Sequence, residues 1–348
     1  MALYALILAG GRGTRFWPRS RASRAKQVLE FLGAGTLIQQ TVARLSPVVR
    51  EERMWVLTSP LLRSEIIRQL PNVPPRQVLA EPAQRNTAPA IGLACHILES
   101  LDPRAVVGVF PADHFIARPK PFLTIVRRAF REAAAGHIAI IGIHPRWPET
   151  GYGYIEFAPG SGQVRRFVEK PDLATAKRFL RSGRYAWNAG MFFWRPRVFL
   201  DALRRHLPKT ASLLASLPPF DDRNFTRKLA SVFPQCENIS VDYAVMEKVR
   251  GVVGFAAGDI GWSDVGSWNA VYELLAKDSS GNALKGDVLV LDAAGNYVEA
   301  PHKLVALLGV QDLIVVDTPD ALLVARRDHA QRVSELVKLL ESRRRDLL

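Results

Sequence analysis

A glycine-rich segment near the N-terminus is the part of the sequence best suited to bind phosphate groups. It consists of Leu8-Ala-Gly-Gly-Arg-Gly-Thr-Arg-Phe-Trp-Pro, and Lys26 follows soon after. Its glycines let main-chain amides approach phosphate oxygens closely, while Thr14, Arg15 and Lys26 add a hydroxyl donor and positive charge. We therefore predict a nucleotide-binding loop formed by Leu8, Ala9, Gly10, Gly11, Gly13 and Thr14.

An aspartate, Asp113, stands where ligands bind in many α/β proteins. It comes just after the apolar run from Val106 to Phe110, which we interpret as a buried strand. Open α/β sheets bind ligands at the carboxyl ends of their strands. We therefore expect the Asp113 carboxylate to hold Mg²⁺, and the alternative is an aspartate that caps a helix or a turn.

The formal net charge of +14 raises the question of nucleic-acid binding. Most arginines are scattered along the chain, and the sequence has no recognition helix, zinc finger or aromatic RNA-binding signature. One cluster directly after the first glycines suits a small polyphosphate better than a duplex. It consists of Arg12, Arg15, Arg19, Arg21, Arg24 and Lys26. We expect no nucleic-acid partner.

Alternating strands and helices must position these residues. Nearly continuous apolar runs predict buried strands at residues 3–9, 54–57, 106–110 and 138–143. Helical spacing of apolar residues predicts helices at 37–45, 88–101 and 122–135. This alternation predicts an α/β fold with a mainly parallel sheet and helices on both faces.

The pattern changes after the segment Lys277-Asp-Ser-Ser-Gly-Asn. Short apolar strands follow at nearly regular spacing, at residues 288–291, 297–300, 304–308, 313–316 and 321–325. A final helix has one apolar face, formed by Val333, Leu336, Val337 and Leu340. We predict a catalytic domain over residues 1–277 and a small β-roll or β-solenoid domain with a terminal helix over residues 278–348.

Membrane and secreted classes are not favoured by the sequence. No apolar run approaches the roughly 20 residues that a membrane-spanning helix needs, and the first residues lack a signal-peptide pattern. The two cysteines, Cys95 and Cys236, give neither a metal-ligand spacing nor a disulfide framework. We therefore expect a cytoplasmic protein without a membrane partner.

Several strings along the chain resemble those of the sugar-phosphate nucleotidyltransferases. After the glycine-rich segment and Lys26-Gln27 come Glu81-Pro-Ala-Gln-Arg-Asn-Thr-Ala-Pro-Ala, Phe110-Pro-Ala-Asp-His, Thr150-Gly-Tyr-Gly-Tyr-Ile, Val168-Glu-Lys-Pro, Trp187-Asn-Ala-Gly-Met-Phe-Phe-Trp, Ser240-Val-Asp-Tyr-Ala-Val-Met-Glu-Lys and Gly261-Trp-Ser-Asp-Val-Gly-Ser-Trp. The match spans nearly the whole chain, and within the family it is similar to the guanylyltransferases that act on mannose 1-phosphate. The resemblance implies a Rossmann-like, GT-A-like catalytic domain and a C-terminal unit like a left-handed β-helix.

The resemblance also implies a reaction, in which GMP passes from GTP to mannose 1-phosphate and pyrophosphate is released. Asp264 is then the second carboxylate on Mg²⁺ beside Asp113, and Arg15 and Lys26 act on the phosphates. A further loop is expected over the purine, formed by Glu81, Arg85, Asn86 and Thr87. Thr87 could equally be the N-cap of the helix that follows.

Four residues are expected at the sugar phosphate. Gly153 lets the main chain approach a hydroxyl-rich ring, Glu169 can accept from two hydroxyls, and Asn188 can both donate and accept. By resemblance Lys170 meets the phosphate. The alternative for Glu169 is a surface salt bridge, and the role of Asp242 stays open between a site residue and a helix cap.

The sequence departs from the family pattern at Ala25, where a proline usually precedes the lysine, so we expect a looser loop that keeps its charge. Two other functions stay open: the same chemistry with glucose 1-phosphate and ATP, UTP or dTTP, and an inactive homologue that senses nucleotide sugars. Some larger relatives carry a phosphomannose isomerase domain. This sequence ends too soon for one, so we expect a single activity and a C-terminal unit that supports a homodimer.

Overall fold

The computed structural model describes residues 2–11, 13–33 and 35–348. They form two compact units, each assembled from separate stretches of the chain. The first unit contains residues 1–10, 42–112 and 116–262, and the second contains residues 11–41, 113–115 and 263–348. The predicted boundary between residues 277 and 278 divides the chain along its sequence, which this grouping does not test.

One sheet forms the centre of the first unit. Its strands follow the order β10-β6-β9-β4-β1-β2-β3, and β7 pairs with both β9 and β8. Along that order β9 is antiparallel to its neighbours β4 and β6, and the other pairs are parallel, which confirms the predicted mainly parallel sheet. The strands are β1 (Leu3–Ala9), β2 (Met54–Thr58), β3 (Val78–Ala80), β4 (Val106–Pro111), β6 (Ala139–Ile143), β7 (Tyr154–Phe157), β8 (Val164–Val168), β9 (Tyr185–Trp194) and β10 (Val253–Ala257).

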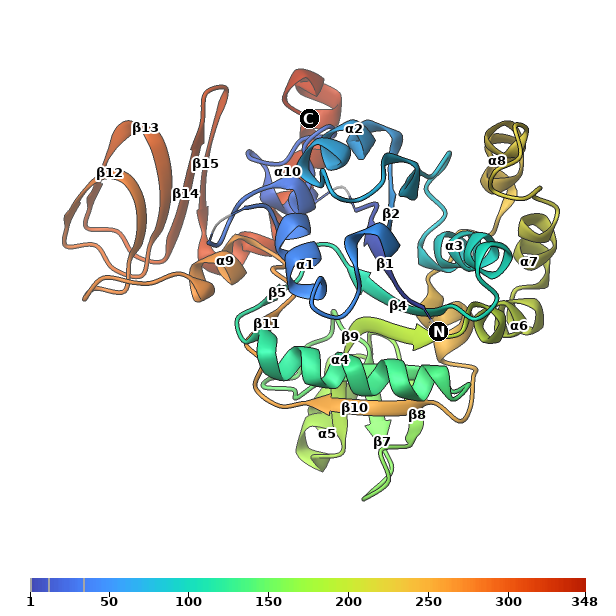
Figure 1. The fold of residues 1–348 in the computed structure, drawn as a ribbon. Helices are drawn as coiled ribbons and strands as arrows, with labels where there is room; N and C mark the ends of the chain where they lie inside the picture. Colours follow the sequence, from blue (N-terminus) through green and yellow to red (C-terminus); the bar gives the residue numbers. More distant parts are fainter. Residues whose placement is uncertain (1, 12, 34) are drawn as a thin grey trace. The chain divides into compact units, whose positions relative to one another are not determined.

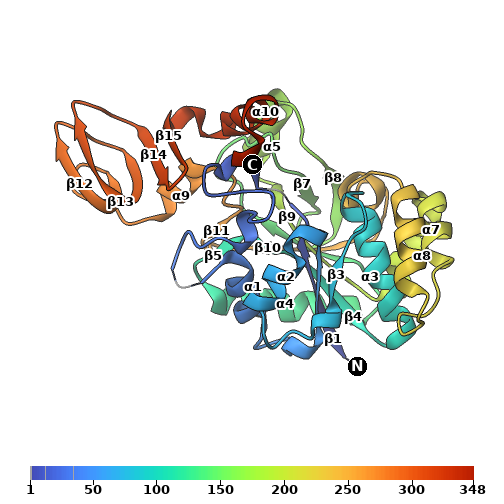
Figure 2. The same cartoon turned by 90° about the horizontal axis from the view of Figure 1, so that it is seen from above.

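Helices cover both faces of this sheet (Figures 1 and 2). They are α2 (Pro60–Gln69), α3 (Thr87–Leu101), α4 (Pro119–Ala134), α5 (Leu173–Ser182), α6 (Pro196–His206), α7 (Pro208–Ala215) and α8 (Phe225–Val232). A Cβ added to Gly108 of β4 would lie 2.9 Å from Phe130 of α4, whereas the next residue, Val109, packs in the core that contains Ile91 of α3. Successive strand residues point to opposite faces, so α3 and α4 lie on opposite sides of the sheet.

The second unit combines short strands with two helices. The strands β12, β13 and β14 pair in parallel in chain order, and β15 is antiparallel to β14. Its elements are α9 (Trp268–Leu274), β12 (Ala283–Leu291), β13 (Tyr297–Leu308), β14 (Leu313–Thr318), β15 (Ala321–Arg326) and α10 (Val333–Arg343). Three other elements span the points where the chain passes from one unit to the other: α1 (Leu37–Leu45), β5 (Phe115–Ile116) and β11 (Trp262–Ser263).

The core of the second unit includes residues from both ends of the chain. Phe16 and Trp17, which directly follow the glycine-rich loop, pack in one cluster with Trp268, Tyr297 and Val333. The segment after the loop is therefore fixed by the same apolar core that holds the C-terminal strands and α10.

Two predictions for the C-terminal elements were wrong in detail. The strands expected at 297–300 and 304–308 form one strand, β13, because a shift of register against β12 after Gly286 absorbs the polar residues between them. On α10, Val333 and Val337 are buried but Leu336 is exposed, so the buried stripe of this helix is narrower than its apolar pattern.

Among the described residues, no helix is long and apolar enough to cross a membrane. Cys95 and Cys236 are both buried and unbonded to each other. The cytoplasmic location stays a prediction.

Candidate active site

Lys26 lies at the centre of the polar contacts around the predicted metal ligands. Its Nζ donates to Asp113 Oδ2 at 2.8 Å and to the main-chain carbonyl of Asp264, and its side chain is only 8% exposed. The three residues come from three separate stretches of the second unit. The fold therefore brings the lysine of the glycine-rich segment to both predicted metal ligands.

Gly13 holds Lys26 in this position. Its φ is +63°, and an added Cβ would lie 2.6 Å from both N and Cβ of Lys26, so only glycine fits. Gly13 also precedes a short 3-10 turn over Thr14–Phe16. An added Cβ at Gly11, by contrast, would meet no described atom within 4 Å, so open space lies over the amide region where a phosphate is predicted.

The Asp113 carboxyl is ionised at neutral pH. Burial raises its pKa, but the positive charges of Lys26 and His114 outweigh burial, and the pKa lies below its ordinary value. Its ion-pair partner is Lys26, and it lies in a turn after β4 and not at a helix terminus.

The donor set suits a hard divalent cation. The Asp113 side chain is 36% exposed, and the Asp264 carboxylate lies against Gly266, where an added Cβ would be 2.8 Å from Oδ2. Among the described residues no group of three or more His, Cys, Asp and Glu side chains could hold a metal. Two carboxylates fit a cation such as Mg²⁺, which takes its remaining ligands from water and phosphate.

The predicted arginine cluster is divided by the fold. Arg15 is exposed, whereas Arg19 pairs with Glu299 at 2.6 Å and Arg21 pairs with Asp320 at 2.8 Å. Arg12 lies outside the described residues. Arg19 and Arg21 therefore contact carboxylates of β13 and of the turn between β14 and β15, which the sequence alone did not indicate.

The predicted purine loop belongs to the first unit. Glu81 lies beside Gly10, where an added Cβ would be 3.3 Å from Oε1, and burial raises the pKa of Glu81 to about 8. Asn86 is the N-cap of α3, because its Oδ1 accepts from the Thr87 N–H at 2.9 Å. The alternative that Thr87 caps the helix was wrong, since Asn86 is the cap and Thr87 Oγ1 accepts from the Val241 N–H at 2.8 Å.

Neighbouring strands fix the end of β1, where Leu8 and Ala9 lie. The Leu8 carbonyl accepts from the Ala112 N–H, and the Ala9 carbonyl accepts from Thr58 Oγ1, both at 3.0 Å. Arg85 in the purine loop has a buried Nε without a hydrogen-bond partner among the described residues. The two hydrogen bonds hold the end of β1 in place. The Arg85 Nε–H is available as a donor to a ligand.

The predicted sugar residues lie together in the first unit. The Asn188 N–H donates to the Gly153 carbonyl at 2.7 Å, and Asn188 Nδ2 donates to Asp242 Oδ1 at 2.8 Å. A Cβ added to Gly153 would lie 2.4 Å from Glu169 Oε2, so a side chain there would displace the Glu169 carboxylate. Asp242 is the first residue of a one-turn π-helix, Asp242–Met246, and contacts Asn188 instead of capping a helix.

Glu169 sits among other carboxylates. Its side chain is 8% exposed and forms an ion pair with the neighbouring Lys170, whose Nζ lies 3.3 Å from Oε1, so the alternative of a salt bridge is present with its carboxylate buried. Its Oε2 lacks a hydrogen-bond partner among the described residues. Burial raises its pKa to about 7, with further contributions from Asp242 and Glu247. Glu247 was not predicted as a site residue, and its Oε1 accepts from the Glu169 N–H at 2.9 Å. Glu169 Oε2 is therefore an acceptor available to a ligand that donates hydrogen bonds.

An open hollow of about 800 Å³ lies elsewhere in the first unit, where β6 and β10 end. Its lining includes His144, Arg146, Tyr185 and Trp262 but none of the predicted site residues. Hollow volume alone therefore does not locate the candidate site.

Known families match both parts of the chain. A model of the nucleotidyl transferase family matches residues 4–281, and a model described as a MannoseP isomerase/GMP-like beta-helix domain matches residues 286–340. The chain belongs to the nucleotidyl transferase family. The predicted enzyme class and the predicted fold, an α/β nucleotidyltransferase domain followed by a β-helix-like unit, are thereby confirmed.

Individual relatives match over almost the whole chain. A mannose-1-phosphate guanylyltransferase of Klebsiella pneumoniae is 39% identical over 99% of this chain and 75% of its own length. The xanthan biosynthesis protein XanB of Xanthomonas campestris pv. campestris is 40% identical over 97% of this chain and 73% of its own length. A crystal structure from Thermus thermophilus, described as a mannose-1-phosphate geranyltransferase, has a TM-score of 0.87 at 35% identity and covers 98% of this chain and 100% of that one. The predicted resemblance to the mannose-1-phosphate guanylyltransferases is confirmed.

Proposed function

We propose that the protein transfers GMP from GTP to α-D-mannose 1-phosphate, giving GDP-mannose and pyrophosphate. The observation that carries the proposal is the meeting of Lys26 with Asp113 and the Asp264 main chain. A lysine paired with the Asp113 carboxylate and bonded to the Asp264 main chain suits the phosphates and cation of a nucleoside triphosphate. The names of the relatives supply the sugar, and they do not favour the glucose 1-phosphate alternative.

Enzymes of this family generally use a divalent metal. We propose Mg²⁺, which Asp113 and Asp264 would hold. When bound, it would neutralise charge on the phosphates of the two reactants and so lower their repulsion.

The reaction needs no side chain that acts as a general base. A phosphate oxygen of mannose 1-phosphate attacks the α-phosphorus of GTP, forming one P–O bond as the bond to the bridging oxygen of the β-phosphate breaks. The attacking phosphate is already an anion near neutral pH, so the protein contributes positioning and positive charge. Lys26, the exposed Arg15 and the amides of Gly11 and Gly13 are the groups we assign to the leaving pyrophosphate.

For the nucleotide, we assign the end of β1 and the loop from Glu81 to Thr87. Guanine presents an N–H and an amino group side by side, and Glu81 would accept from both once its carboxyl is ionised, which burial disfavours in the free protein. Leu8, Ala9, Gly10 and the Arg85 loop would complete this site around the base and ribose.

For the sugar phosphate, we assign Gly153, Glu169, Lys170 and Asn188, and we add Asp242 through its contact with Asn188. The unpartnered Glu169 Oε2 would accept from a ring hydroxyl. Lys170 is about half exposed and would meet the phosphate.

Pyrophosphate release tests the proposal. Purified protein with Mg²⁺ would be given GTP, ATP, UTP or dTTP, each with mannose 1-phosphate and with glucose 1-phosphate. A signal confined to GTP with mannose 1-phosphate is expected. Another preferred pair would reject the substrate assignment, and silence from folded protein would favour an inactive homologue.

We also propose that the protein forms a homodimer through the second unit. Large apolar side chains on its strands are exposed, including Leu289, Leu291, Leu308, Leu322 and Val324. Exposed apolar patches commonly mark contact surfaces. Light scattering after size exclusion should give twice the chain mass, and a monomer at micromolar concentration would reject this assembly.

A further inference from the structure

We propose that Glu299 on β13 and Asp320 in the turn between β14 and β15 are positioning residues for the phosphate-binding loop. Through Arg19 and Arg21 they fix the anchor segment, Trp17–Arg21, and through it the places of Arg15 and Lys26. The C-terminal strands then influence the rate of the reaction in addition to any role in assembly. The inference rests on the proposed function, since it concerns the leaving pyrophosphate.

Glu299 is the buried end of the first tether. Its side chain is 6% exposed, and Oε1 accepts from Arg19 Nη1 at 2.6 Å while Oε2 accepts from Tyr297 Oη at 2.6 Å. Arg19 also donates to the Glu30 carbonyl at 2.9 Å. One guanidinium thus joins β13 to main chain on the far side of Lys26, and charge-assisted bonds of this kind fix geometry as well as adding energy.

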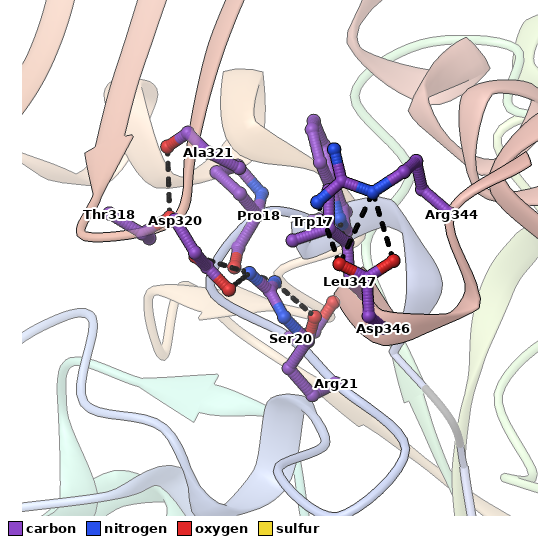
Figure 3. Close-up of polar contacts among 10 residues, drawn as sticks. All are labelled: Trp17, Pro18, Ser20, Arg21, Thr318, Asp320, Ala321, Arg344, Asp346 and Leu347. Carbon is purple, nitrogen blue, oxygen red and sulfur yellow. Dashed lines mark hydrogen bonds and ion pairs between the residues drawn. The ribbon is translucent and has the colours of Figure 1, made fainter.

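Figure 3 shows the second tether, around Arg21 and Trp17. Arg21 Nη2 donates to both carboxylate oxygens of Asp320, at 2.8 and 3.0 Å, and its Nη1 donates to the Pro18 and Ser20 carbonyls. Trp17 Nε1 donates to the Leu347 carbonyl at 3.1 Å. The anchor segment is therefore bound to a strand turn and to the end of the chain.

A short path connects the anchor segment to Lys26. Arg21 and Arg24 exchange two main-chain hydrogen bonds of 3.0 Å, and the buried Ala25 comes next. On the other side of the anchor, Phe16 packs on Trp268, whose Nε1 donates to the Trp17 carbonyl at 3.0 Å. Because the path is short and is closed by these main-chain hydrogen bonds, we expect a shift of Arg19 or Arg21 to move Lys26. Misplacement of a catalytic group by about 1 Å can cost about a hundredfold in rate.

The chain offers a matched control for Glu299. Asp317 on β14 is also buried, with a side chain 1% exposed, and its ion-pair partner is Lys303 of β13 at 2.8 Å. Glu299→Gln and Asp317→Asn each replace a buried carboxylate by an amide on neighbouring strands. Only the first removes a charge that faces the anchor segment.

Steady-state kinetics of both variants test the proposal. For Glu299→Gln we expect kcat to fall at least about tenfold and KM for GTP to rise a few-fold, while KM for mannose 1-phosphate changes less than twofold. For Asp317→Asn we expect kcat within twofold of the unchanged protein. Equal kcat values for the two folded variants would overturn the proposal. Should Glu299→Gln not fold, Asp320→Asn at the half-exposed tether is expected to lower kcat two- to fivefold, and an unchanged kcat would overturn it.

Hydrogen exchange without substrate separates this inference from the proposed function. Amides of residues 13–26 should exchange faster in Glu299→Gln than in the unchanged protein and in Asp317→Asn, because the tether no longer closes the loop. Equal exchange in all three proteins would overturn the tether itself. Absence of turnover in the unchanged protein would reject the proposed function, and the exchange result would still decide whether Glu299 holds the loop.

Discussion

In the second unit the Asp113 carboxylate lies 2.8 Å from the Lys26 ammonium, whereas in the first unit Glu169 lies among Asp242 and Glu247 and pairs with the exposed Lys170. The pKa of Asp113 is lowered, because positive charge outweighs burial. The pKa of Glu169 is raised to about 7, because burial and neighbouring carboxylates both disfavour its ionised form. One carboxylate has its charge balanced in the free protein, and the other does not.

This difference fits two kinds of ligand. When a cation and a triphosphate bind, Asp113 can pair with the cation and Lys26 with the triphosphate, so neither charge is left buried alone. The buried Glu169 carboxylate is stabilised by a donor such as a sugar hydroxyl, because the hydrogen bond offsets part of the cost of removing the carboxylate from water. Neutralising each of the two carboxylates should therefore change the stability of the folded protein in opposite directions.

The largest effect is expected at the balanced site. Asp113→Asn keeps the side-chain shape but removes a predicted metal ligand and the charge that faces Lys26. Turnover should fall by about a thousandfold or more, because metal ligation contributes several kcal/mol to charge stabilisation. Pyrophosphate release measures the loss, and circular dichroism checks the fold.

The exposed Asp287 of β12 supplies the control for this change. Asp287→Asn removes the same charge from the same unit and should keep full activity. Near-normal turnover by folded Asp113→Asn would show that Asp113 is not a ligand of the catalytic metal, and the comparison of the two carboxylates would then fail.

The unbalanced site should show a smaller effect that is confined to one substrate. Glu169→Gln weakens acceptance from sugar hydroxyls, and hydrogen bonds to charged groups contribute about 1.5–3 kcal/mol. KM for mannose 1-phosphate should rise about tenfold or more, with KM for GTP nearly unchanged. Initial rates with each substrate varied in turn measure both constants. A rise in the GTP constant alone would show that Glu169 does not belong to the sugar site.

The same substitution should raise stability, and the gain should depend on pH. The pKa of Glu169 is raised from 4.5 to about 7 by folding, so between these values the folded protein holds more protons and stability falls as pH rises. This cost, on the order of 1–3 kcal/mol, is fully present above pH 7 and absent below pH 4.5. Melting curves should therefore place Glu169→Gln a few degrees above the unchanged protein at pH 8 and level with it near pH 4.5.

Asp113→Asn provides the opposite sign for that comparison. It leaves the buried Lys26 ammonium without its carboxylate partner, so its melting temperature should be lower than that of the unchanged protein at pH 8. If the melting temperatures of both variants shifted in the same direction at pH 8, the charges of Asp113 and Glu169 would be compensated to the same degree in the folded protein.

Local patterns were enough to predict much of the fold. The strand at 3–9 and the helix at 37–45 have the predicted bounds, because an apolar run and a helical period are properties of a few consecutive residues. Asp113 was predicted from its place after a strand, and the strand is present as β4.

Contacts between distant residues could not be predicted in this way. Lys26 meets residues 87 and 238 positions away, and Arg19 and Arg21 meet carboxylates 280 and 299 positions away. Nothing near Arg19 in the sequence distinguishes a tether from a phosphate ligand. Glu247 was missed for the same reason, since its contact with the Glu169 N–H depends on how two distant segments meet.

The smallest expected effect concerns Ala25, the position where the family usually has proline. Ala25 has φ −74°, which proline can adopt, and its N–H donates no hydrogen bond to a described residue. Ala25→Pro should therefore raise the free energy of unfolding by about 0.4–1 kcal/mol, chiefly by restricting the unfolded chain. Because the contacts of Lys26 and the Arg19 and Arg21 ion pairs all stay in place, kcat should change less than twofold.

Chemical denaturation measures this gain, and Ala25→Gly is the matched control, since it loosens the unfolded chain and should lower stability by a similar amount. Ala25 is fully buried, so the ring needs space beside Lys26. A destabilised Ala25→Pro protein with low kcat would mean that this chain has closed that space. A stabilised protein with unchanged kcat would instead show that the loop has room for the proline ring and that Lys26 keeps its position.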